Sequence, residues 1–103
     1  MNVFSATGNV CGGVRRETRR GDRVEARFRF AVDRDFKNAD GKRDADYYTV
    51  VCAGREAEYA LERVFKGARV ALTGSRSCRE MHDEDGVKRY ENVIFVNKLE
   101  VQP

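Results

Sequence analysis

The stretch from Ala31 to Gly54 decides the fold and reads AVDRDFKNADGKRDADYYTVVCAG. An apolar run ends at Val32, a β-rich run begins at Tyr47, and Asp40-Gly41 lies near the middle of the charged residues between them. Asp-Gly between two strand-like segments is a strong signal for a β-hairpin. The stretch therefore predicts two antiparallel strands joined by a tight, highly charged turn.

Alternation of apolar and polar residues predicts strands on both sides of this hairpin. In the strand before the turn, Phe28 and Phe30 share the apolar face, whereas Arg27 and Arg29 share the opposite face. The five predicted strands span residues 3–10, 24–32, 47–53, 68–80 and 91–101. The last of them is apolar on both faces, which indicates burial on two sides.

One helix is predicted over residues 55–65, where Ala57, Ala60, Leu61 and Val64 are spaced i, i+3, i+4, i+7. Acidic residues lie early in this segment, as the helix dipole favours.

Two polar segments remain. Residues 11–23 are interpreted as a loop or ragged hairpin whose arginines either contact phosphate or face solvent. Residues 81–90 are interpreted as a charged hairpin loop with its turn at Asp85-Gly86.

Composition points to one domain spanning residues 1–103 and large enough for one modest core. The formal net charge is only +3, but 15 of the 20 basic residues are Arg, which grips phosphate and stacks on rings better than Lys. The alternative explanation for this count is a general preference for Arg in the genome. Charge alone therefore does not imply nucleic acid.

Cysteine usage and hydropathy bear on location. Cys11, Cys52 and Cys78 are scattered without a CxxC motif, as expected in a reducing cytoplasm. No signal-peptide core and no 18-residue apolar run is present, so we expect a cytoplasmic protein without a membrane span.

The enzyme interpretation is weak, and no cofactor is expected. His82 is the only histidine, and no P-loop, GxGxxG, HExxH or GxSxG motif is present. Asp83-Glu84-Asp85 could hold a hard cation, but three consecutive acids at a turn more often face solvent.

The aromatic pair in the deciding stretch favours nucleic acid. Phe36 and Tyr47 lie on either side of the turn among basic residues. Rings that stack bases, beside cations that meet phosphates, are what single-stranded nucleic acid requires. Packing of both rings in a core or an interface is the alternative.

An ordered series of short motifs runs through the chain: Met1-Asn2 with Gly8-Asn9, Phe30-Ala31-Val32, Phe36-Lys37-Asn38, Gly41, Asp46-Tyr47, Val50-Val51, Gly54, Lys66-Gly67, Val70, Gly74, and Asp85-Gly86 with Arg89-Tyr90. In this order they resemble the bacterial single-stranded DNA-binding protein family over essentially the whole chain. The resemblance implies an all-β protein with a five-stranded OB-fold, a Greek-key barrel with one helix between strands three and four.

The resemblance also implies a DNA-binding site. The family's four base-stacking positions fall on Phe36, Tyr47, Ala53 and Met81, so half of the stacking platform is not aromatic here. Met81 can still cover a base through its thioether, whereas Ala53 cannot. The predicted DNA-binding residues are Phe36, Tyr47, Met81, Arg27, Arg29, Arg34, Lys37, Thr49, Arg79, Lys88 and Arg89.

Two departures from the family bear on partners. Gly12-Gly13-Val14 replaces the Asp-Pro-Glu pattern usual after the first strand. Family members continue into a disordered tail whose acidic tip docks partners, whereas this sequence ends at Pro103. We therefore expect tail-mediated recruitment to be absent.

The family implies a homo-oligomer, a tetramer or alternatively a dimer. The two-sided apolar last strand and an exposed Tyr48 ring favour such self-association.

Two functions follow. The first is sequence-independent binding and protection of single-stranded DNA, in replication, recombination or repair, at the nucleoid in the cytoplasm. The alternative is an accessory OB-fold similar to primosomal replication protein B, acting mainly through protein contacts. The sequence does not separate DNA from RNA as the ligand, because a stacking groove need not read the 2′-hydroxyl.

Overall fold

Six strands, one α-helix and one 3-10 turn make up the computed structural model, which describes the backbone of residues 1–103 and every side chain except those of Arg19 and Arg20. The elements are β1 (Phe4–Val10), β2 (Arg15–Arg19), η1 (Arg20–Asp22), β3 (Arg23–Lys37), β4 (Arg43–Ala53), α1 (Arg55–Arg63), β5 (Arg69–His82) and β6 (Lys88–Val101). No helix of the described chain is long and apolar enough to cross a membrane.

Five of these strands close into a barrel. The sheet order is β1-β5-β6-β4-β3-β2, and β1 also pairs with β3, which joins the two ends of the five-stranded part. Neighbouring strands are antiparallel except β4 and β6, which run parallel. The predicted five-stranded OB-fold with one helix between its third and fourth strands is confirmed. The short strand β2 pairs with β3 beyond the barrel wall, where a loop or ragged hairpin was predicted.

The core lies inside the barrel and under α1. Phe28 and Phe30 point inward and meet edge-on, with ring centroids 6.3 Å apart, as the alternation predicted. The apolar face of α1 covers one end of the barrel, where Ala57 and Ala60 are fully buried. The helix stops at Arg63, two residues before its predicted end.

Two glycines allow backbones to approach closely. A Cβ at Gly8 would meet the carbonyl oxygen of Ala31 and a ring carbon of Phe30 at 2.9 Å. A Cβ at Gly74 would meet the backbone carbonyl of Phe95, at the register shift between β5 and β6. The first site closes the barrel, and the second bends β5 around it.

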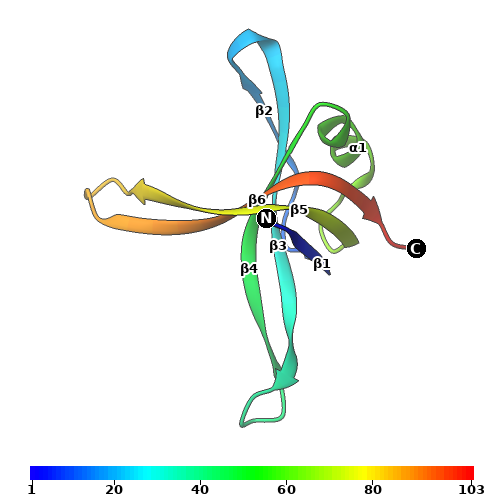
Figure 1. Cartoon of the computed structure of the whole chain (residues 1–103), viewed down its shortest axis with the longest axis vertical. Coiled ribbons are helices and arrows are strands. Elements are labelled where there is room, and N and C mark those ends of the chain that lie inside the picture. The colour runs from blue at the N-terminus through cyan, green and yellow to red at the C-terminus, as the bar shows by residue number, and fades with distance from the viewer.

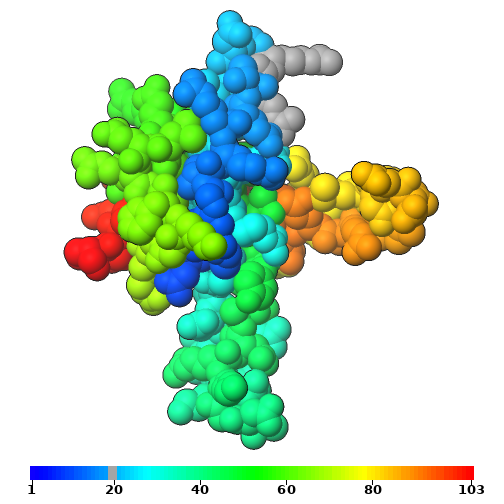
Figure 2. All heavy atoms as spheres, turned by 180° about the vertical axis from the view of Figure 1, so that it is seen from behind, coloured from blue at the N-terminus to red at the C-terminus, as the bar shows by residue number. Residues whose placement is uncertain are grey.

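Three hairpins project from the barrel as arms (Figure 1), which we call the β2–β3, β3–β4 and β5–β6 arms. Seen from behind, the β3–β4 and β5–β6 arms stand clear of the central mass (Figure 2). The radius of gyration is 14.5 Å, against about 13 Å expected for a compact domain of this length.

The arms are longer than the sequence predicted. β3 continues to Lys37 and β4 begins at Arg43, whereas the predicted strands ended at residue 32 and began at residue 47. Both faces of the β3–β4 arm meet water, so its strands carry no apolar alternation and their outer parts were not recognised. In the β5–β6 arm the difference is smaller: β5 ends at His82 rather than at residue 80, and β6 begins at Lys88 rather than at residue 91.

The turns lie where Asp-Gly predicted them. Asn38 Oδ1 accepts hydrogen bonds from the backbone N–H groups of Asp40 and Lys42, both at 3.0 Å. Asp83 Oδ1 accepts equivalent bonds from Asp85 and Val87, at 3.0 and 2.9 Å. One side-chain oxygen therefore organises the tip of each of these two arms, ahead of a glycine with φ of 77°.

Two features predicted to favour self-association differ in the structure. Tyr48 is half-buried and packs edge-on against Phe4, with ring centroids 5.0 Å apart, so its ring is not the exposed surface that was expected. Tyr48 pairs with Phe30, which places it on the inner face of the sheet. On the last strand, Val93 is fully buried within a single chain, and Phe95 is 40% exposed.

Candidate functional site

Three predicted residues meet on the outer face of β3 and β4. Because Phe28 and Phe30 fill the barrel, Arg29 points outward, and Thr49 pairs directly with it across the ladder. The Arg29 guanidinium donates to Thr49 Oγ1 at 3.3 Å and lies 5.8 Å from the centroid of the Tyr47 ring. A cation over an aromatic face is attractive. The Tyr47 ring is 54% exposed and is thus held in place with an open side.

Arg27 shares this outer face but is covered. Its side chain is only 12% exposed, and its guanidinium lies 3.1 Å from Glu17 on β2 and 4.0 Å from Glu25 on β3. Two outward arginines were predicted on β3. Arg29 is therefore the more accessible of them to a ligand, because carboxylates already hold Arg27.

The β5–β6 arm divides its predicted residues between two faces. Met81 pairs with Arg89, and Arg79, two residues before Met81, lies on the same face. Glu80 pairs with Tyr90, and His82 pairs with Lys88, so these four residues lie on the opposite face. Lys88 and Arg89 are neighbours in sequence but cannot contact one ligand strand along a single face.

Two of the three predicted cations on this arm, Lys88 and Arg89, already hold carboxylates. Lys88 Nζ lies 3.3 Å from Glu80, and Arg89 Nε lies 3.2 Å from Asp83 Oδ2. The pKa of Asp83 lies below its ordinary value, chiefly because the Val87 backbone N–H donates to the carboxylate, with Arg89 adding to the effect. Asp83 thus forms the turn with one oxygen and holds Arg89 with the other.

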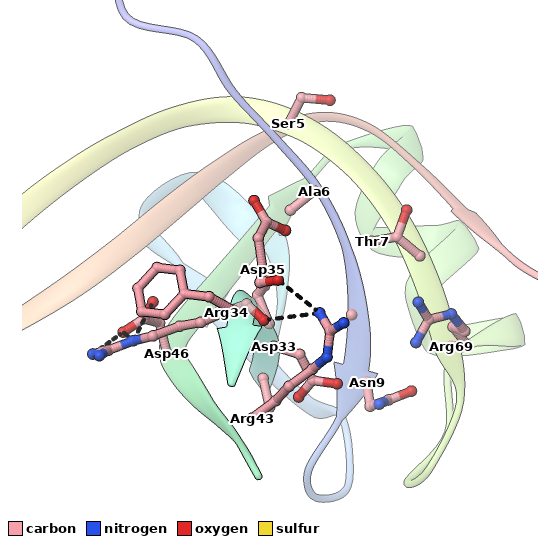
Figure 3. A pocket seen from close by; sticks show the side chains of 14 residues that line it. Ser5, Ala6, Thr7, Asn9, Asp33, Arg34, Asp35, Arg43, Asp46 and Arg69 are labelled. Atoms are coloured by element: carbon pink, nitrogen blue, oxygen red, sulfur yellow. Dashed lines mark hydrogen bonds and ion pairs between the residues drawn. The ribbon is translucent and has the colours of Figure 1, made fainter. Parts of the chain in front are cut away.

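A groove of about 840 Å³ separates β1 from the β3–β4 arm (Figure 3). Phe36, 70% exposed, lines it together with the ion pair of Arg34 and Asp46, whose closest N–O distance is 3.0 Å. The hydrogen bonds that Arg34 donates to the Asp46 carboxylate hold the pKa of Arg34 above its ordinary value. Arg43 crosses the arm and donates to the carbonyl oxygens of Arg34 and Asp35, at 3.2 and 3.1 Å.

Phe36 and Tyr47 therefore occupy different surfaces. Phe36 lines the groove beside β1, whereas Tyr47 lies on the outer face with Arg29. Tyr47 pairs with Ala31, and Phe36 lies five residues further along β3, so the alternation of the strand puts the two rings on opposite faces; a register irregularity follows between Asp33 and Lys37. Lys37 lies beyond this irregularity, exposed and paired with Arg43 near the tip of the arm.

Sequence reasoning missed several residues of these surfaces. Arg43, Arg69 and Asn9 line the groove with Phe36, because β1 and β5 lie beside the arm only in the folded chain. Tyr90 is 70% exposed on the second face of the β5–β6 arm. Its place beside Arg89 in one of the family-like motifs was the signal that could have drawn attention to it.

The remaining reactive groups do not form a second centre within the described part of the chain. Burial, together with the nearby Glu56 carboxylate, raises the pKa of the Cys52 thiol to about 12, so it stays protonated at neutral pH. Cys11 and Cys78 are exposed thiols. Among the described residues, no three His, Cys, Asp or Glu side chains lie close enough together to hold a metal ion.

Comparison with known proteins places this geometry in a family. The model of the single-strand binding protein family matches residues 1–102. The chain belongs to this family. Among its relatives, it is 34% identical over 80 residues to single-stranded DNA-binding protein 1 of Streptococcus pyogenes serotype M6, covering 78% of this chain and 60% of that protein. It is 32% identical over 74 residues to single-stranded DNA-binding protein 1 of Lactococcus lactis, covering 72% and 49%.

A structural relative supports the fold of this family member. The crystal structure of a small single-stranded DNA-binding protein from Streptomyces coelicolor superposes with a TM-score of 0.83, covering 97% of this chain and 93% of the other at 20% identity. The chain spans roughly half of the length of the curated relatives just described, between 49% and 60%.

Proposed function

We propose that this chain binds and protects single-stranded DNA without sequence preference, in replication, recombination or repair, and acts at the nucleoid in the cytoplasm. The observation that carries the proposal is the open Tyr47 ring held under the Arg29 guanidinium, with Thr49 beside it. A ring with a free face stacks any base, and the adjacent cation attracts the phosphate. Relatives in the same family carry single-stranded DNA binding in their names.

Binding in this proposal is an exchange of anionic partners. Arg34, Lys88 and Arg89 each hold a carboxylate on an exposed arm. Exposed ion pairs contribute little to stability, so a DNA phosphate can replace the carboxylate at small cost. Exposed rings supply the remaining affinity, roughly 1–3 kcal/mol per stacked base.

The proposal predicts a preference for single strands over duplex. Bases in a duplex are already stacked on each other, and the described chain offers no base-reading helix for a groove. Titration of the protein with fluorescent dT, rU and duplex oligonucleotides of equal length should give the highest affinity for single strands. The logarithm of affinity should fall with the logarithm of salt concentration by about 0.7 per phosphate contacted.

Equal affinity for duplex and single strand would contradict the proposal. Absence of binding to every oligonucleotide would favour the accessory role that acts through protein contacts. The ratio between dT and rU measures whether the site distinguishes DNA from RNA.

The two exposed rings should each contribute to affinity. Phe36→Ala and Tyr47→Ala are expected to weaken binding to dT by roughly 1–3 kcal/mol each, because each removes a stacking surface. Phe65→Ala is the matched control, since Phe65 is also exposed, at 60%, but follows α1 and belongs neither to the groove nor to the outer face of β3 and β4. A ring whose removal lowers the melting temperature but leaves the affinity of the folded protein unchanged is structural.

Releasing Arg89 from its carboxylate should strengthen binding. In Asp83→Asn, the side-chain oxygen can still accept the turn hydrogen bonds from Asp85 and Val87, but the charge that holds Arg89 is gone. We expect a several-fold higher affinity for dT at low salt, with the gain shrinking as salt screens the charges. Arg89→Ala in the same background should abolish the gain, and an unchanged affinity in Asp83→Asn would remove Arg89 from the binding site.

The proposed assembly is a homotetramer, alternatively a dimer. From Phe4 to Gly8, β1 pairs only with β5 in the described backbone, so the other edge of these residues is available to a second strand. Small side chains on the outer face, such as Ser5, Thr7 and Ala71, would let another sheet lie close.

Light scattering at micromolar concentration should give four times the 11.8 kDa chain mass. Thr7→Glu should reduce the mass, because it places charge where copies would meet. A monomer mass for the unaltered protein would refute self-association.

A further inference from the structure

We propose that the outer face of the β2–β3 arm is a phosphate-binding extension of the Tyr47 surface, and that Arg15 makes the contact. This inference rests on the proposed function and adds a binding site to it. The ligand is the phosphodiester backbone of a single strand that continues past the bases stacked near Tyr47.

The register of the arm places two arginines side by side. Arg15 on β2 pairs directly with Arg27 on β3, so both side chains leave the same face of the sheet. Directly opposed residues on an antiparallel pair lie about 4.5–5.5 Å apart at Cβ, and like charges there repel. This arrangement is unfavourable unless anions compensate both cations.

The carboxylates of the arm compensate only one of the two. Glu17 and Glu25 lie 3.1 and 4.0 Å from Arg27, whose side chain is almost covered. Arg15 is exposed and forms no ion pair or hydrogen bond with any side chain that the structure describes. The arm therefore presents one uncompensated guanidinium next to a compensated one, which is an attractive position for a phosphate.

The position lies on the same sheet face as the proposed stacking surface. Arg27, Arg29 and Ala31 alternate outward along β3, and Ala31 pairs with Tyr47. Four residues of strand separate Arg27 from Ala31, which is about 14 Å. A strand that stacks on Tyr47 and runs along the outer face of β3 would reach Arg15 only after a few more nucleotides.

The adjacent residue supplies a matched control. Arg16 pairs with Ala26, which is fully buried, so Arg16 lies on the opposite face of the arm. There it borders a cleft shared with Glu58 and Glu62 of α1. Arg15→Ala and Arg16→Ala thus remove the same charge from neighbouring exposed positions on opposite faces.

Fluorescence anisotropy on the full chain, with dT oligonucleotides of increasing length and a series of salt concentrations, tests the inference. Arg15→Ala should lower affinity for long oligonucleotides by roughly three- to tenfold at low salt and reduce the salt slope by about 0.7. Short oligonucleotides that reach only Tyr47 should bind unchanged. Arg15→Lys should retain most of the affinity, and Arg16→Ala should bind like the unaltered chain.

The possible results separate this inference from the proposed function. If the unaltered chain binds dT but Arg15→Ala and Arg16→Ala lose affinity equally, or Arg15→Ala loses none, the extension is refuted and the Tyr47 surface stands. A loss in Arg15→Ala that does not depend on oligonucleotide length also refutes the extension. If the unaltered chain does not bind dT, both proposals are refuted.

Discussion

Closure of the barrel depends on one short contact between β1 and β3. Only Asn9 with Ala31 and Val10 with Phe30 pair across it, supported by the Cys11 backbone N–H donating to Arg29 O at 2.9 Å. Gly8 allows this approach because any side chain there would meet the Ala31 carbonyl and the Phe30 ring. Beyond this contact the two strands separate. The groove that Phe36 lines therefore opens where this short pairing between β1 and β3 ends.

The pairing of cations with neighbouring carboxylates shapes the candidate site more than the net charge of the chain does. The chain carries a formal charge of only +3, and carboxylates hold Arg27, Arg34, Lys88 and Arg89. Three of these pairs lie on exposed arms, where a phosphate can compete with the carboxylate. Arg27 is covered and stays with Glu17. Counting cations along the sequence would therefore overestimate the charge that a nucleic acid meets.

Most of the barrel follows from the sequence, because burial imposes a period of two on each of its strands. Phe28 and Phe30 occupy the inner face and Arg29 the outer face, as their alternation predicted. A ragged hairpin was one of two alternatives for residues 11–23, and strand β2 was not located within it because Arg15, Arg16, Glu17 and Thr18 show no apolar period. The family membership and the Asp-Gly turns were equally readable from local motifs.

The parts of the candidate site that depend on the pairing register of the strands could not be predicted from the sequence. Ala31 is the residue that pairs with Tyr47, which leaves Phe36, five residues further along β3, on the other face, and the local sequence does not signal this register. Pairing of Arg89 with Asp83 and of Lys88 with Glu80 follows from the turn geometry of one arm. The outward side of Val93 is buried by neighbours that come together only in the folded chain.

The arms have a consequence for how this protein can change. The residues of the main hydrophobic cluster lie in the barrel and α1, and the arm tips contribute none of them. The candidate contacts on the arm tips therefore lie apart from the core, whereas Arg29 and Thr49 stand on the wall of the barrel itself. An arm can be lengthened, shortened or recharged by mutation while the barrel continues to fold, so its surface can diverge quickly. Selection on the barrel, in contrast, acts at positions such as Gly8 and Phe30, where almost any substitution would disturb closure.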